Sequence, residues 1–243
     1  MGFFEMNELL ITRITIDWSR IGPQSYLRDI KAICGIDRLD FGRSVTFFVG
    51  ENGTGKSTLL EGIAVAYGFN PEGGTKNYNF STYDSHSELC DAVKISRGPY
   101  KAAGGYFLRA ESFYNVATME KEYMQGLSNE YHKRSHGESL LELVKSSFRP
   151  RGIYLLDEPE AALSPQNQLT LLLEMHRLSR QGAQFIVATH SPILLALPDA
   201  AILSFDDGAV HPCAYEETGS YQVMSLFIRN RDYVLHHLLA DEH

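Results

Sequence analysis

Residues 50–57 read Gly-Glu-Asn-Gly-Thr-Gly-Lys-Ser, a pattern typical of phosphate-binding loops. Glycines let successive backbone N–H groups curl around an anion, and the N-terminus of a following helix adds partial positive charge. Lys56 can supply a full charge to the β- and γ-phosphates of a nucleotide, and the Ser57 hydroxyl is a hard oxygen ligand suited to Mg²⁺. We therefore predict a nucleotide site made by Gly50, Glu51, Asn52, Gly53, Thr54, Gly55, Lys56, Ser57 and Thr58.

The flanks of this loop predict the strand and the helix that such a loop requires. Residues 45–49 are mostly apolar and predict a short buried strand. The segment Lys56–Tyr67 has apolar residues at helical spacing and is followed by Gly68, a residue that commonly ends helices. The alternative is a glycine-rich turn that has no function. Such a turn would not require both a buried strand before it and a helix after it.

Two adjacent carboxylates, Asp157 and Glu158, follow the continuous apolar run 153–156. Such a run is typical of a strand buried on both faces of a parallel sheet. Two carboxylates at its end are costly unless a cation compensates them, and Mg²⁺ held by Ser57 and a nucleotide would do so. The alternative, acidic residues that merely end a strand, is common for one carboxylate and much less so for this pair.

A histidine lies just after another apolar run that is also expected to form a buried strand. His190 follows residues 185–188 and is flanked by Thr189 and Ser191. A histidine after a strand is more often structural than catalytic. Ligands of open α/β sheets, however, bind at the carboxyl ends of the strands, so we expect a functional role for His190.

A further polar cluster, residues 134–139, precedes an apolar segment with helical spacing. Ser135 is a suitable N-cap, and Glu138 three residues later completes a capping box. Taken alone, the cluster is best interpreted as a capped helix.

The rest of the chain alternates between predicted strands and helices. Residues 9–18, 106–110 and 202–205 are expected to be strands, with a hairpin at Asp207-Gly208 and one or two helices over 221–239. This alternation indicates an α/β fold with a mostly parallel core sheet. The helix that starts after the N-cap Ser164 is expected to end near residue 181 and to carry on one face Leu169, Leu172, Leu173 and His176.

Composition narrows the function classes. The net charge of −8 argues against a chain that coats nucleic acid by bulk electrostatics, although a local basic groove is compatible with it. The three cysteines are far apart, which fits reduced thiols in a cytoplasmic protein. No apolar run approaches the length of a membrane span, and we expect neither a signal peptide nor membrane insertion.

This set of motifs resembles the ABC-type ATPases, in particular the soluble branch that includes SMC, RecF and the OLD-like "AAA family" ATPases. Asn52 in the loop is typical of that branch, whereas transporter subunits usually have serine there. Residues 135–138 are similar to the signature motif, which binds the γ-phosphate of ATP held by the opposite subunit. Residues 155–159 are similar to the Walker B strand, 161–164 to the D-loop and 189–191 to the switch-histidine loop.

The resemblance implies ATP and Mg²⁺ as ligands and a role for each site residue. Asp157 would hold Mg²⁺ through water, as would Glu111 if it occupies the Q-loop position, where the family has glutamine. Glu158 would be the general base, with Lys56 and His190 as further catalytic residues. The site that binds ATP in one copy would be completed by the signature residues of the partner copy, which here are Ser135, Gly137 and Glu138.

The resemblance also implies the domain organisation and the partners. We expect an ABC-ATPase-type P-loop NTPase domain over residues 1–243, with a small antiparallel β lobe and an inserted lobe over about 69–134. Because Ser135 follows Ser57 by only 78 positions, we do not expect the long coiled coil of SMC proteins between them. The 53 residues after His190 are likewise fewer than the nuclease domain of the OLD type would need, so we do not expect that domain. An ATP-dependent homodimer would then act with DNA or with a separately encoded effector, a nuclease or toxin, in DNA repair or defence. The alternatives are the ATP-binding subunit of a membrane transporter and a regulatory module with little turnover.

Overall fold

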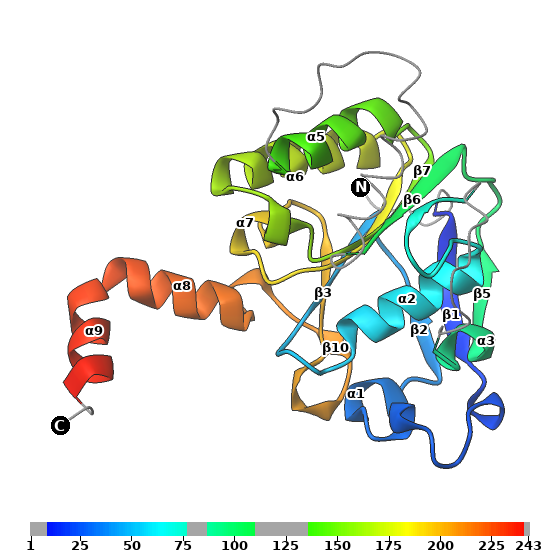
Figure 1. Cartoon of the computed structure of the whole chain (residues 1–243), viewed down its shortest axis with the longest axis horizontal. Helices are drawn as coiled ribbons and strands as arrows, with labels where there is room; N and C mark the ends of the chain where they lie inside the picture. The colour runs from blue at the N-terminus through cyan, green and yellow to red at the C-terminus, as the bar shows by residue number, and fades with distance from the viewer. Residues whose placement is uncertain (1–8, 77–86, 110–135, 241–243) are drawn as a thin grey trace.

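The computed structural model of the chain describes residues 9–76, 87–109 and 136–240, and in these ranges it contains two sheets (Figure 1). The larger sheet has the strand order β10-β9-β3-β8-β7-β6-β4. Its five central strands are parallel, and the two edge strands β10 and β4 pair antiparallel. The strands are β3 (Val45–Val49), β4 (Gly74–Thr75), β6 (Gly104–Leu108), β7 (Gly152–Asp157), β8 (Gln184–Ala188), β9 (Ala201–Ser204) and β10 (His211–Pro212).

The smaller sheet is antiparallel and has the order β2-β1-β5. Its strands are β1 (Ile11–Ile16), β2 (Arg38–Asp40) and β5 (Val93–Arg97). In the register, Ile14 of β1 lies opposite Leu39 on one side and Ile95 on the other. The prediction of a mostly parallel core sheet with a small antiparallel one is therefore confirmed.

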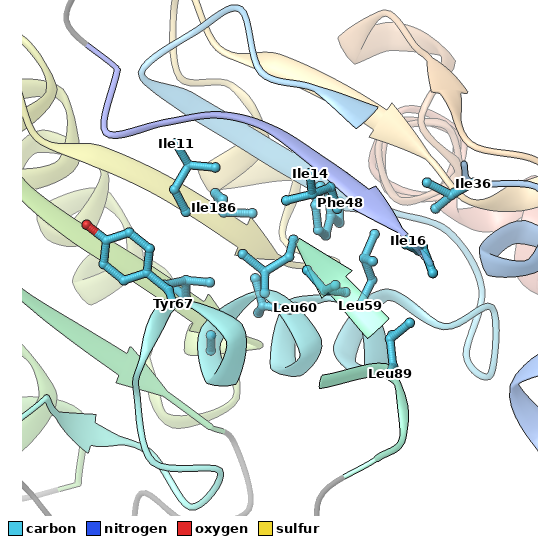
Figure 2. Close-up of a cluster of buried hydrophobic side chains, with 14 of the residues drawn as sticks. Ile11, Ile14, Ile16, Ile36, Phe48, Leu59, Leu60, Tyr67, Leu89 and Ile186 are labelled. Carbon is cyan, nitrogen blue, oxygen red and sulfur yellow. The ribbon is translucent and has the colours of Figure 1, made fainter. Parts of the chain in front are cut away.

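Helix α2 (Lys56–Tyr67) lies between the two sheets (Figure 2). Leu59 and Leu60 are completely buried, and the cluster they belong to also contains Ile14 of β1, Phe48 of β3 and Ile186 of β8. Because α2 is covered by apolar side chains of both sheets, its first turn is held in a fixed position at the end of β3. The short helices α1 (Lys31–Cys34) and α3 (Leu89–Ala92) lie in the same layer of the fold.

Three helices cover the opposite face of the larger sheet: α5 (His136–Ser147), α6 (Pro165–Ser179) and α7 (Pro192–Leu195). The second hydrophobic cluster lies here, and the rings of Phe148 and Tyr154 stack in it with centroids 3.9 Å apart. Both faces of β3, β7 and β8 are thus buried, which explains why their sequences are almost continuously apolar.

The described strands between residues 69 and 109 pair with the two sheets: β4 and β6 join the larger sheet, and β5 joins the smaller one. The inserted lobe over about 69–134 stays a prediction. One sequence prediction needs correction. On α6, Leu169 and Leu173 are 46% and 64% exposed, and the buried residues are Leu171, Met175 and Leu178. Both sets recur at helical spacing, so periodicity alone could not select the face that packs.

The C-terminal helices α8 (Gly219–Arg229) and α9 (Arg231–Ala240) extend away from the sheets (orange and red in Figure 1). Among the helices in the described ranges, none combines the length and the apolar character that a membrane crossing needs. The short 3-10 segments that connect elements are η1 (Trp18–Arg20), η2 (Tyr26–Arg28), η4 (Pro159–Ala162), η5 (Asp206–Gly208) and η6 (Tyr215–Glu217).

Candidate functional site

The phosphate-binding loop connects β3 to α2, as predicted, and α2 begins at Lys56. Gly50, Gly53 and Gly55 all have positive φ, at 136°, 82° and 99°, a region that favours glycine. At Gly55 a side chain would also have no room, since a Cβ there would lie 2.6 Å from a side-chain carbon of Ile33. The glycine positions are therefore required by the path of the loop itself.

Lys56 is buried within this loop, with 4% of its surface exposed. Its Nζ donates to the carbonyl oxygens of Gly50 at 2.6 Å and Glu51 at 2.8 Å. Burial lowers the pKa of Lys56, and nearby carboxylates, Glu158 first among them, act in the opposite direction. The loop thus encloses a cationic group among backbone dipoles, an arrangement suited to a polyanionic ligand.

Ser57 and Asp157 meet at the carboxyl edge of the larger sheet. The Ser57 hydroxyl donates to Asp157 Oδ1 at 2.8 Å. Burial raises the pKa of the Asp157 carboxyl to about 6, while the hydrogen bond from Ser57 acts to lower it. A buried carboxylate beside a hydroxyl oxygen fits a hard cation such as Mg²⁺, which would relieve the cost of burying the charge.

This pair alone is not a complete protein cage for a cation. In the described ranges, no group of three or more His, Cys, Asp or Glu residues is placed to hold a metal ion. Mg²⁺ commonly uses one or two protein ligands together with phosphate oxygens and water. The residues present therefore fit an ion that binds with a nucleotide.

Glu158 follows Asp157 with a left-handed backbone, φ 45° and ψ 52°. Its N–H donates to the Ala188 carbonyl at 2.9 Å, and its carbonyl accepts from the Ala161 N–H. These bonds fix the backbone while the side chain stays 40% exposed, and Oε1 lies 3.9 Å from His190 Nε2. The two predicted catalytic side chains are therefore neighbours at the end of β7 and β8.

Glu160 contacts the histidine loop and was not predicted from the sequence. Its Oε1 accepts from the His190 N–H at 2.5 Å, which ties η4 to the end of β8. Glu160 Oε2 and His190 Nε2 are both buried atoms without a hydrogen-bond partner among the described residues. Buried polar atoms normally have partners, so this corner of the site is polar and lacks hydrogen bonds that a ligand or water could supply.

Asp206 is a second residue that the sequence analysis missed. Its Oδ1 accepts from the Glu51 N–H at 2.8 Å, and its Oδ2 accepts from the Ser204 hydroxyl at 3.2 Å. A Cβ on Gly50 would lie 2.9 Å from Asp206 Oδ1, so the carboxylate lies directly against the loop. Asp206, in η5 just after the neighbouring strand β9, therefore positions the first half of the phosphate-binding loop.

Arg109 is the first residue after β6, and it contacts α2, the helix that follows the phosphate-binding loop. Its Nη2 is 3.0 Å from Glu61 Oε2, and it acts to lower the pKa of Asp157. A cavity of about 590 Å³ opens beside it, lined by Gln24, Ser25, Tyr26, Thr58, Glu61, Ser87, Glu88 and Arg109.

The predicted site residues fall into three groups. Lys56, Ser57, Asp157, Glu158 and His190 come together at one edge of the larger sheet. Gly137 and Glu138 lie in the first turn of α5, which packs on the opposite face of that sheet from α2. Ser135 and Glu111 lie outside the described residues.

Residues 96–196, less than half of the chain, match the family model described as "AAA domain, putative AbiEii toxin, Type IV TA system". This region resembles an AAA-type ATPase domain. It includes Asp157, Glu158 and His190, and it supports the resemblance to ATPases of the SMC/RecF-like branch that the motifs indicated. No curated protein matches the chain.

Two solved structures of SMC heads are also similar to this chain. The SMC head domain from Thermotoga maritima is 15% identical, with 85% of this chain and 100% of that chain covered and a TM-score of 0.46. The Smc head domain with a coiled coil and joint derived from Pyrococcus yayanosii is 25% identical, with 38% and 19% covered and a TM-score of 0.29.

Proposed function

We propose that the chain is a Mg²⁺-dependent ATPase in which two copies close head to tail around ATP. The observation that carries the ATPase proposal is the meeting of Lys56, Ser57, Asp157, Glu158 and His190 at one sheet edge. A phosphate cradle, a cation site and a carboxylate beside a histidine are the groups that hydrolysis of a phosphoanhydride requires.

Each residue has a defined part in this proposal. Lys56 and the loop N–H groups bind the phosphates. Ser57 and Asp157 would hold Mg²⁺, which would supply positive charge to the phosphates. Glu158 orients the attacking water and accepts its proton, because its side chain is exposed while its backbone is fixed. His190 donates to the developing charge on the transferred phosphoryl group.

The position of α5 supports the dimer. Helix α5, which begins with the predicted signature residues Gly137 and Glu138, packs on the face of the larger sheet away from α2. We infer that these residues complete the ATP site of a second copy rather than that of their own. ATP would then form part of the interface and stabilise the closed dimer by linkage. Hydrolysis would release it.

The proposal also concerns the partner on which the ATPase acts. We infer a switch that acts with DNA or a separately encoded effector, in repair or defence. The description of the matching family, which names a putative AbiEii toxin of a type IV TA system, favours defence.

Steady-state ATPase assays with and without duplex DNA test the proposed activity. We expect Mg²⁺-dependent turnover that Lys56→Ala abolishes, with Lys31→Ala, an exposed lysine outside the loop, as the matched control. Stimulation by DNA would support the DNA branch of the proposal. ATP binding without turnover in the wild type would contradict the ATPase assignment and leave a regulatory module.

A further inference from the structure

The C-terminal arm, defined as α8 and α9 (residues 219–240), is attached to the body only at its root (Figure 1). Thr218 is buried there, the Tyr215 and Tyr221 rings contact each other with centroids 4.7 Å apart, and the Tyr215 hydroxyl donates to the Pro192 carbonyl at 3.0 Å. Beyond this root, neither helix of the arm has a buried residue, and both the burial and the attachment refer to the part of the chain that the structure describes.

The exposed surface of the arm is largely apolar. From Gln222 onward, the polar side chains of α8 form one narrow stripe, Gln222, Ser225 and Arg229, at spacings of three and four residues. The remaining circumference is apolar, and Val223 and Ile228 are 70% and 71% exposed. The other large exposed apolar side chains of the arm are Met224, Leu226, Phe227, Tyr233, Leu238 and Leu239.

Helices of this length need tertiary packing to persist. Isolated helices shorter than about 12–15 residues are marginal in water, and α8 and α9 have 11 and 10 residues. An apolar face wider than half of a helix is typical of a helix covered by more than one neighbour. The arm therefore requires a cover that the rest of this chain does not provide in the described structure.

We propose that this cover is the same arm of a second copy, independently of nucleotide. The eight side chains are 39–71% exposed. If most of that exposed surface is covered, the contact buries roughly 700 Å² per copy, close to the ~800 Å² per partner of a standard stable interface. A twofold axis would place the same apolar patch of each arm against its copy, which is the self-complementary contact of a symmetric dimer.

The charge of the arm supports a second copy over a membrane surface. The charged side chains in 219–240 are Arg229, Arg231 and Asp232, so the patch is nearly neutral and does not repel its own copy. Helices that lie on membranes usually carry several basic residues on the polar face, whereas the polar stripe of α8 has one and the chain has a net charge of −8. Apolar patches with few charges are typical of homodimers.

Sedimentation velocity of the nucleotide-free full chain at micromolar concentration tests this proposal. We expect a dimer for the wild type, and a shift to monomer for Ile228→Glu and for Val223→Glu, with dimer affinity reduced at least about tenfold. Gln222→Glu adds the same charge on the polar stripe and is expected to remain dimeric. Nucleotide binding and far-UV circular dichroism show whether each variant retains the ATPase body.

Several results would overturn the proposal. A wild-type chain that is monomeric without nucleotide contradicts the proposal. If that monomer sediments with phosphatidylcholine–phosphatidylglycerol vesicles, the arm binds membranes instead. If it forms a complex only with another protein, the arm binds that protein instead. A variant with normal nucleotide binding that remains dimeric also contradicts it, because the dimer would then use another surface. The proposed ATP-dependent closure is unaffected by either result, since it uses different residues.

Discussion

The Ser57 hydroxyl donates a 2.8 Å hydrogen bond to Asp157 Oδ1, although a hundred positions separate the two residues in the chain. The parallel order β3-β8-β7 produces this contact, because it places the carboxyl ends of β3 and β7 at the same edge of the sheet. The contact links the phosphate-binding loop to the acidic strand end and defines where a cation would be held.

Asp157→Asn should uncouple nucleotide binding from Mg²⁺. Asparagine retains an oxygen that can accept from Ser57 but removes the negative charge that compensates a cation. We expect ATP affinity measured with Mg²⁺ to fall about tenfold or more, and affinity measured in EDTA to stay unchanged. Asp199→Asn, at the opposite edge of the sheet, is the matched control. An unchanged Mg²⁺ dependence would show that Asp157 does not hold the ion.

Asp206→Ala should weaken nucleotide binding without removing any residue of the phosphate-binding loop. The substitution leaves the Glu51 N–H without its charged acceptor, and hydrogen bonds to charged groups are worth about 1.5–3 kcal/mol. We expect a loss of roughly tenfold in ATP affinity, with partial recovery in Asp206→Asn. The exposed Glu216→Ala serves as control. Equal affinities for wild type and Asp206→Ala, measured by titration calorimetry, would refute the positioning role.

Much of the fold could be predicted from local patterns. The helix after the phosphate-binding loop begins and ends where periodicity and Gly68 placed it, and Ser164 caps α6 by accepting from the Asn167 N–H. Which face of α6 packs could not be predicted, because Leu169 and Leu173 have the same spacing as the buried set. The strand pairing of residues 69–109 was also missed, since short strands carry no information about which sheet they join.

The site residues that belong to a recognisable sequence motif could be predicted. Asp206 and Glu160 were missed because they belong to no such motif. Asp206 follows an apolar strand, as Asp157 and His190 do, and that shared position was the available signal. Glu160 follows Glu158 by two residues, but its contact with the His190 N–H depends on the left-handed turn at Glu158, which the sequence does not indicate.

Glu160→Ala should slow hydrolysis more than it weakens binding. The side chain holds the His190 N–H rather than the phosphate loop, so its loss should displace the histidine loop from the γ-phosphate position. We expect kcat to fall at least about tenfold with KM changed less than about threefold, and Glu160→Gln, which keeps an acceptor oxygen, to recover part of the rate. A matching fall in ATP affinity would indicate a general disturbance of the site instead.

Thiol chemistry tests the burial of the α3 region. Burial raises the pKa of the Cys90 thiol to about 12, and Glu61 and Asp91 add to this shift. At pH 8 the thiolate fraction is then on the order of one in ten thousand, and it stays small up to pH 9. In the native protein we expect iodoacetamide to label the exposed Cys34 and to spare Cys90 until the chain is unfolded. Peptide mass spectrometry locates the label, and equal labelling of both thiols would contradict this packing.

The central claim is that each ATP is hydrolysed at a site shared by two copies, and mixing two inactive variants tests it most directly. Lys56→Ala removes phosphate binding but leaves the signature segment, whereas Ser135→Arg blocks the signature and leaves the phosphate loop. Each variant alone should be inactive in single-turnover hydrolysis. An equal mixture should recover roughly a quarter of the wild-type amplitude, because half of the dimers contain one intact shared site. A mixture no more active than its separate components would contradict the account.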